Sequence, residues 1–126
     1  MAVGKEVGSF ASAITSMTKS RDAAGNHTFV IDVEGTVVSG WSGAVVGIIS
    51  GTSADFKLGT YTADFAAYLD DGNVLSGVAS GVIGGQEGYQ WQLNGVALIS
   101  KGSRVTTEGV LELANRTYNG KMFAIS

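Results

Sequence analysis

The stretch YTADFAAYLDDGNVLSGVASG (residues 61–81) contains two segments of alternating polarity joined by a tight turn. The turn is Asp70-Asp71-Gly72-Asn73, which is typical of a hairpin because Gly and Asn tolerate the positive φ angles that such turns require. Before the turn, side chains of one parity are apolar, which predicts a strand with one buried face. The members of that face are Tyr61, Ala63, Phe65, Ala67 and Leu69, and the opposite face carries Thr60, Thr62, Asp64 and Tyr68.

Comparable segments continue outward from this hairpin in both directions. Turn formers occupy residues 20–26, and we expect further loops at 39–40 and 51–54. No stretch of 11 or more residues has the apolar spacing of a helix between recognisable caps. The strands that we predict cover residues 7–19, 29–34, 44–49, 56–69, 74–83, 88–100, 104–115 and 117–125.

Glycine is the most informative residue type, with 19 in a chain of 126 residues that has no proline. Glycine weakens a flat strand, but it permits the bends and bulges that a small barrel needs. About eight strands with short turns and no helical crossovers predict an all-β protein, a single antiparallel up-and-down β-barrel formed by residues 1–126. A two-sheet sandwich is the alternative. The glycines expected inside strands are Gly35, Gly47, Gly59, Gly77, Gly81 and Gly109.

Composition excludes several classes of function. The net charge is −3 and the eight basic residues are scattered, so we predict no nucleic-acid partner. The chain has no cysteine and one histidine, His27, which we interpret as a surface residue, so we predict no metal and no cofactor. No segment has the apolar length of a membrane span or the pattern of a signal peptide. We therefore predict a cytoplasmic protein with no membrane insertion, although a processed mature form would have the same pattern.

No nucleophile motif or phosphate-binding loop is present, so an enzyme would depend on isolated polar groups. Asp64 lies in the most apolar strand and would have a raised pKa if it pointed inward, but the outward orientation is the expected one. Asn94-Gly95 and Asn119-Gly120 each fit either a hairpin turn or a strand bulge. When the sequence is aligned with itself at an offset of 50 residues, the matching residues place Asn94-Gly95 inside a strand. Asn119-Gly120 fits a turn well.

Five aromatic residues are the candidates for a ligand-binding site: Trp41, Tyr61, Phe65, Tyr89 and Trp91. Barrels of about eight strands contain side chains alone or one small ligand. The same rings therefore fit an aromatic-lined cavity or simple filling of the core.

The glycine-spaced segments 71–81, 91–95 and 119–121 resemble those of allene oxide cyclase-like and dirigent-like barrels, including small bacterial relatives. This resemblance covers roughly residues 25 to 125. It implies an eight-stranded antiparallel barrel with an apolar central cavity, and in some relatives a cyclisation guided by cavity shape. None of the family's catalytic residues matches a position in this sequence.

Three functions are therefore expected for this chain. The first is binding of a small, largely apolar ligand in the lumen of the barrel. The second is a cofactor-free cyclase or isomerase, which needs an inward polar group such as Asp64 or Asn94; whether any reaction is catalysed stays open. The third is a structural role for a filled barrel whose apolar outer faces pack together, because strands that are apolar on both sides predict a homo-oligomer.

Overall fold

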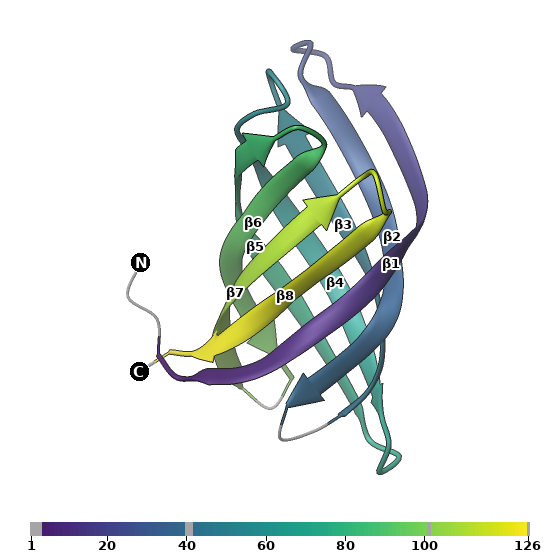
Figure 1. The fold of residues 1–126 in the computed structure, drawn as a ribbon, viewed down its shortest axis with the longest axis vertical. Coiled ribbons are helices and arrows are strands. Elements are labelled where there is room, and N and C mark those ends of the chain that lie inside the picture. Colours follow the sequence, from purple (N-terminus) through teal and green to yellow (C-terminus); the bar gives the residue numbers. More distant parts are fainter. Residues whose placement is uncertain (1–3, 40–41, 101, 126) are drawn as a thin grey trace.

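The computed structural model describes residues 4–39, 42–100 and 102–125, and these form one closed antiparallel barrel. Each strand pairs with the next along the chain, and β8 pairs with β1 (Figure 1). The predicted up-and-down barrel is therefore confirmed. The strands are β1 (Glu6–Arg21), β2 (His27–Ser39), β3 (Ser42–Ser53), β4 (Gly59–Leu69), β5 (Val74–Glu87), β6 (Gln90–Ile99), β7 (Ser103–Glu112) and β8 (Thr117–Ala124).

The strands cross the barrel obliquely because their pairing is staggered (Figure 1). A row of paired residues that starts at Ser20 on β1 returns to the same strand at Ser9, 11 residues away. One residue of this shift is Thr15, which forms a bulge in the β1–β2 ladder. Stagger and strand number together determine the tilt and width of a barrel, so this shift sets the room available inside.

Among the described residues there is no helix of the length and apolarity needed to cross a membrane.

Side chains alternate between the lumen and the outer surface as the sequence pattern predicts. On β6, Leu93, Ala97 and Ile99 are buried, while Asn94 and Leu98 are exposed. The buried side chains form two clusters stacked along the barrel axis. The first cluster contains Ile14, Ile31, Val33, Ile49, Tyr61, Ile83, Leu93 and Leu111, and the second contains Val37, Ala67, Leu75, Ala97, Ile99, Val105 and Met122.

The loop between β3 and β4 lies later in the chain than predicted. We expected a loop at 51–54 and a strand from Phe56, whereas β3 continues to Ser53 and residues 54–58 form the loop. Two side chains explain the shift. The Ser53 hydroxyl accepts a hydrogen bond from the Phe56 amide at 2.9 Å, and the Asp55 carboxylate accepts from Lys57 at 2.8 Å. Such bonds to nearby amides compete with strand pairing and favour a turn.

Both Asn-Gly pairs lie inside strands, Asn94-Gly95 on β6 and Asn119-Gly120 on β8. The turn that fitted Asn119-Gly120 is therefore not formed. Gly120 pairs with Phe10 across the β1–β8 ladder, and a Cβ at Gly120 would stand 2.6 Å from the Phe10 ring. Glycine is required here by the packing of the lumen, which a local turn signal does not record.

Inward glycines lie beside aromatic rings around the whole barrel. Two neighbours illustrate the geometry: Tyr61 on β4 reaches over Gly81 on β5, and its hydroxyl lies 2.5 Å from the position of a Cβ at Gly95 on β6. A side chain at either glycine would occupy the space of the ring or of the adjacent backbone. The ring and glycine pairs are Phe29 with Gly51, Phe65 with Gly77, Tyr61 with Gly95, Tyr118 with Gly109, and Phe10 with Gly120.

Gly81→Ala should lower the free energy of unfolding by about 1–3 kcal/mol, the usual cost of overpacking a core. The new Cβ would overlap the backbone oxygen of Asn94 and stand 2.5 Å from Gly95 Cα. The matched control is Gly84→Ala on the same strand, where the nearest atom is the end of the Leu58 side chain at 3.5 Å. Urea denaturation followed by circular dichroism measures both. Equal stability of the two variants would contradict the steric account.

Candidate functional site

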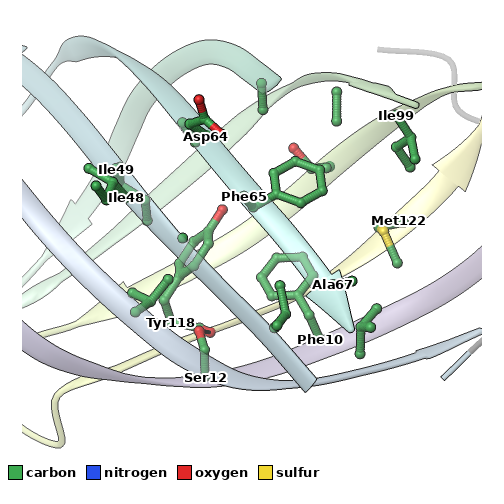
Figure 2. A pocket seen from close by; sticks show the side chains of 18 of the residues that line it. Phe10, Ser12, Ile48, Ile49, Asp64, Phe65, Ala67, Ile99, Tyr118 and Met122 are labelled. Carbon is green, nitrogen blue, oxygen red and sulfur yellow. Dashed lines mark hydrogen bonds between the residues drawn. The ribbon is translucent and has the colours of Figure 1, made fainter. Parts of the chain in front are cut away.

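The lumen contains a small cavity at its centre, which we name the central cavity. Its volume is about 100 Å³. Figure 2 shows the rings of Phe10, Phe65 and Tyr118 projecting into it, and Tyr61 and Met122 complete much of its wall. Binding pockets for drug-sized molecules measure about 300–1,000 Å³. In this structure, side chains therefore fill most of the central lumen.

The buried polar side chains of the central cavity carry hydroxyls, and the exposed residue Asp64 borders the cavity in its wall. The Ser12 hydroxyl donates to the Tyr118 carbonyl at 2.5 Å. The Tyr61 and Thr107 hydroxyls are buried without a hydrogen bond of good geometry in the described structure. Burial raises the pKa of the Tyr61 phenol, against a smaller lowering by Thr107 nearby. Burial also raises the pKa of the Tyr118 phenol, with a further contribution from Tyr61. Both phenols are therefore neutral donors near pH 7 and do not act as bases.

The first core cluster separates this cavity from a second space. Val33, Ile49 and Tyr61 face the central cavity, whereas Ile31 and Ile83 of the same cluster form the floor of a pocket at one end of the barrel. Ile31 is 1% exposed, so the layer between the two spaces is tightly packed. The barrel interior is thus divided along its axis.

The pocket at this end, the mouth pocket, has a volume of about 320 Å³. Its walls are almost entirely apolar and come from β1, β2, β3, β5, β6 and β7 and from three loops. This volume lies within the range of small-molecule sites. The residues that line it are Met17, Lys19, Phe29, Ile31, Ser53, Phe56, Ile83, Gly88, Tyr89, Trp91, Leu111 and Leu113.

The β3–β4 loop is fixed in place so that Phe56 forms one wall of the mouth pocket. The indole NH of Trp91 donates a hydrogen bond to the Phe56 carbonyl. Phe56 itself has a φ of 63°, a left-handed conformation that is unusual for an aromatic residue and costs free energy. Amide hydrogen bonds from Lys57 and Leu58 lower the pKa of Asp55, so its carboxylate stays charged and holds the loop. The wall is therefore preformed.

His27 and Lys19 both lie next to the Phe56 ring, and Lys19 also lines the mouth pocket. The rings of His27 and Phe56 stack with centroids 4.0 Å apart, and the Lys19 ammonium lies 5.9 Å from the centre of the Phe56 ring. Burial lowers the pKa of His27, and the positive charges of Lys19 and Arg21 lower it further. His27 is therefore neutral at pH 7. In the described part of the chain, no three acidic or histidine side chains gather as a metal site would require.

The structure divides the predicted site residues between the two spaces. Tyr61 and Phe65 line the central cavity, and Tyr89 and Trp91 line the mouth pocket. Trp41 lies outside the described residues.

The two polar candidates, Asp64 and Asn94, are both exposed on the outer surface of the barrel. The expected outward orientation of Asp64 is therefore the one observed. Neither residue supplies the inward polar group that the cyclase or isomerase hypothesis requires.

The sequence analysis did not identify Phe29, Phe56, Phe10 or Tyr118 as wall residues. Parity alone places Phe29 on the inner face of its strand, so this signal was present in the sequence. Phe56 carried no such signal because its position depends on the loop hydrogen bonds described above. Phe10 and Tyr118 pack against each other with ring centroids 5.1 Å apart, a contact across 108 residues of chain that no local pattern contains.

No protein-family model matches the sequence, and no curated protein matches it either. The fold is similar to that of a conserved protein of unknown function from Rhodopseudomonas palustris, whose structure has been solved. The two superimpose with a TM-score of 0.80 over 98% of this chain and 97% of that chain, at 14% sequence identity. At this identity the similarity shows the barrel fold alone.

The two buried phenols should make the protein less stable at alkaline pH. Their raised pKa values mean that the folded state keeps protons which the unfolded chain loses above about pH 10. The free energy of unfolding should therefore fall as pH rises past 10, by up to about 1.4 kcal/mol per tyrosine per pH unit. Urea denaturation at several pH values should show a smaller fall for the double variant Tyr61→Phe/Tyr118→Phe. Tyr68→Phe, at an exposed position, should behave as the wild type.

Proposed function

We propose that the protein binds one small, largely apolar molecule in the mouth pocket of the barrel. The observation that carries the proposal is the contrast in volume between the two interior spaces. The mouth pocket, at about 320 Å³, is large enough for a small organic molecule, whereas the central cavity measures about 100 Å³. The ligand would therefore lie at the end of the lumen, above the packed layer that contains Ile31.

The chemistry of the walls narrows the class of ligand. Phe29, Phe56, Tyr89 and Trp91 offer aromatic faces to an apolar body. Of the described residues that line the pocket, Lys19 alone is charged, and it makes no ion pair with another described residue. A ligand with an apolar body and one acceptor or anionic group directed toward Lys19 fits this arrangement.

Preorganisation also supports binding at this site. The loop bonds of Ser53 and Asp55, and the bond from Trp91 to the Phe56 carbonyl, fix the wall before a ligand arrives. A preformed pocket avoids the entropy cost of ordering its walls on binding. A left-handed Phe56 that is retained despite its backbone cost is consistent with a functional role for this loop.

The enzyme hypothesis has less support from the same geometry. Its proposed acid or base, Asp64 or Asn94, would have to reach the lumen, and both side chains are on the outer face. The buried phenols are neutral near pH 7 and act only as hydrogen-bond donors. A cyclase guided by shape, as the allene oxide cyclase-like resemblance implies, therefore has no matched proton-transfer group here. The centre of the lumen is filled by side chains, which favours the third hypothesis, a structural role, for the part of the barrel around the central cavity.

Leu113→Trp should weaken binding by filling part of the mouth pocket. Leu113 is half-buried in the wall near the end of β7, so an indole at this position would occupy space that a ligand needs. We expect the affinity for anilinonaphthalene sulfonate, an apolar dye with one anionic group, to fall at least roughly tenfold, or about 1.4 kcal/mol. Fluorescence titration gives the affinity and the stoichiometry, which should be one dye per wild-type chain.

Val38→Trp is the matched control, because it adds the same side chain at a position 59% exposed on β2. This variant should bind the dye as the wild type does. Unchanged dye binding by a folded Leu113→Trp protein would refute the mouth pocket as the site. Native mass spectrometry of protein purified from its source would then show whether any adduct occupies another part of the barrel.

A further inference from the structure

The outer surface of the barrel has an uneven distribution of charge. The outward side chains of residues 44–52, 60–68, 74–82 and 92–100, on β3 to β6, form what we name the side face. These four segments contain a single charged residue, Asp64. The exposed apolar residues of the side face include Val46, Ile48, Val78, Val82, Val96 and Leu98, each between 38% and 57% exposed.

Most of the charged residues that lie in strands are on the remaining four strands. Asp32 and Glu34 lie on β2, Glu108 lies on β7, and Lys121 lies on β8. A soluble surface disperses its charges, and a contiguous apolar region rimmed by charges is typical of a binding surface. Depletion of charge is also the composition found at the centres of protein interfaces.

One row of paired residues crosses the side face and ends at a basic residue. Asp64, Val78, Leu98 and Arg104 are neighbours on β4, β5, β6 and β7 in successive ladders. They border one shallow depression of about 670 Å³, so their side chains face a common space. Among the described residues, neither Asp64 nor Arg104 has an ion-pair or side-chain hydrogen-bond partner. The row is acidic, apolar, apolar and basic in order. A second copy of the row laid against it in the reverse direction would place basic against acidic and apolar against apolar.

We propose that β4 to β7, the four strands that this row crosses, bind a second copy of the chain across a two-fold axis that runs parallel to the strands between β5 and β6. Such an axis reverses the row, so Asp64 of one copy faces Arg104 of the other, and Val78 faces Leu98. The contact is isologous, with each ion pair formed twice, as closed dimers require. Asp64 is then the carboxylate in an otherwise uncharged face because its partner lies on the other molecule.

The area of the four strands in contact, β4 to β7, fits a stable dimer. Four strands about 4.8 Å apart and nine residues long cover an area of about 19 Å by 30 Å. The accessible surface of projecting side chains exceeds this flat projection, and a typical interface buries about 800 Å² per partner. The small side chains Thr62 and Ser80, which lie between the larger apolar residues, provide hollows for the partner's Val and Leu side chains.

The dimer is independent of the proposed ligand site. None of the residues that line the mouth pocket borders the depression on the side face. The mouth pocket lies at an end of the barrel, so both copies keep their pockets open. Failure of either proposal would leave the other unchanged.

A charge exchange tests the proposed register. Sedimentation velocity should show that the wild type has twice the chain mass, and that Asp64→Arg and Arg104→Asp are each monomeric. Each substitution places like charges together at two symmetric sites, so we expect the dimer dissociation constant to rise on the order of 100-fold or more. The double variant Asp64→Arg/Arg104→Asp restores both pairs with reversed polarity and should dimerise again.

The control is Glu34→Arg, which reverses an exposed charge on β2 outside the side face and should dimerise as the wild type does. Both tested side chains are exposed and unpaired, so the melting temperatures of the dissociated variants show whether they are folded. A wild type that is monomeric at all concentrations, or a trimer, would overturn the proposal. Single variants that dimerise normally, or a folded double variant that stays monomeric, would also overturn it.

Discussion

The close approach of backbones at inward glycines is the constraint on which the rest of this barrel depends. An eight-stranded barrel has an interior only wide enough for side chains to fill. At Gly81 and Gly95 two strands leave no room for a Cβ, and the Tyr61 ring lies over them. An aromatic ring also lies against an inward glycine where Phe10 meets Gly120 and where Phe65 meets Gly77. Closure of the sheet and filling of its lumen therefore depend on the same glycines, because each ring needs the space that a glycine leaves.

This coupling explains where space for a ligand remains. Rings that lie over glycines occupy the centre of the lumen and leave about 100 Å³ there. Toward the mouth, the wall is formed partly by loops, and the side chains of Phe56 and Tyr89 lie at the rim instead of across the axis. The larger pocket is thus found where loop geometry replaces the regular stagger of the strands. Functional sites in proteins are often formed by loops that a rigid scaffold holds in place, and the mouth pocket has this arrangement.

Local pattern was sufficient to predict most of the fold. Period-two alternation identified eight strands, and the turn at Asp70–Asn73 formed as expected, with Gly72 at a φ of 91°. Parity also placed Tyr61 and Phe65 on the inner face. Parity does not give the depth of a residue along the barrel axis, which depends on the stagger between strands. For this reason one predicted aromatic site became two separate spaces, with Trp91 in the mouth pocket.

The ladder between β1 and β8 has a kinetic consequence. It joins residues more than 100 positions apart, as in the bond from Ser12 to Tyr118, whereas every other ladder connects strands adjacent in the chain. The chain must therefore bring together its two most distant segments before the lumen excludes water, and contacts of high sequence separation slow folding. Until then β1 and β8 are free edges with unpaired amides, open to strands of other molecules. We expect the risk of aggregation to be concentrated in this interval, between the formation of the hairpins and the closure of the ring.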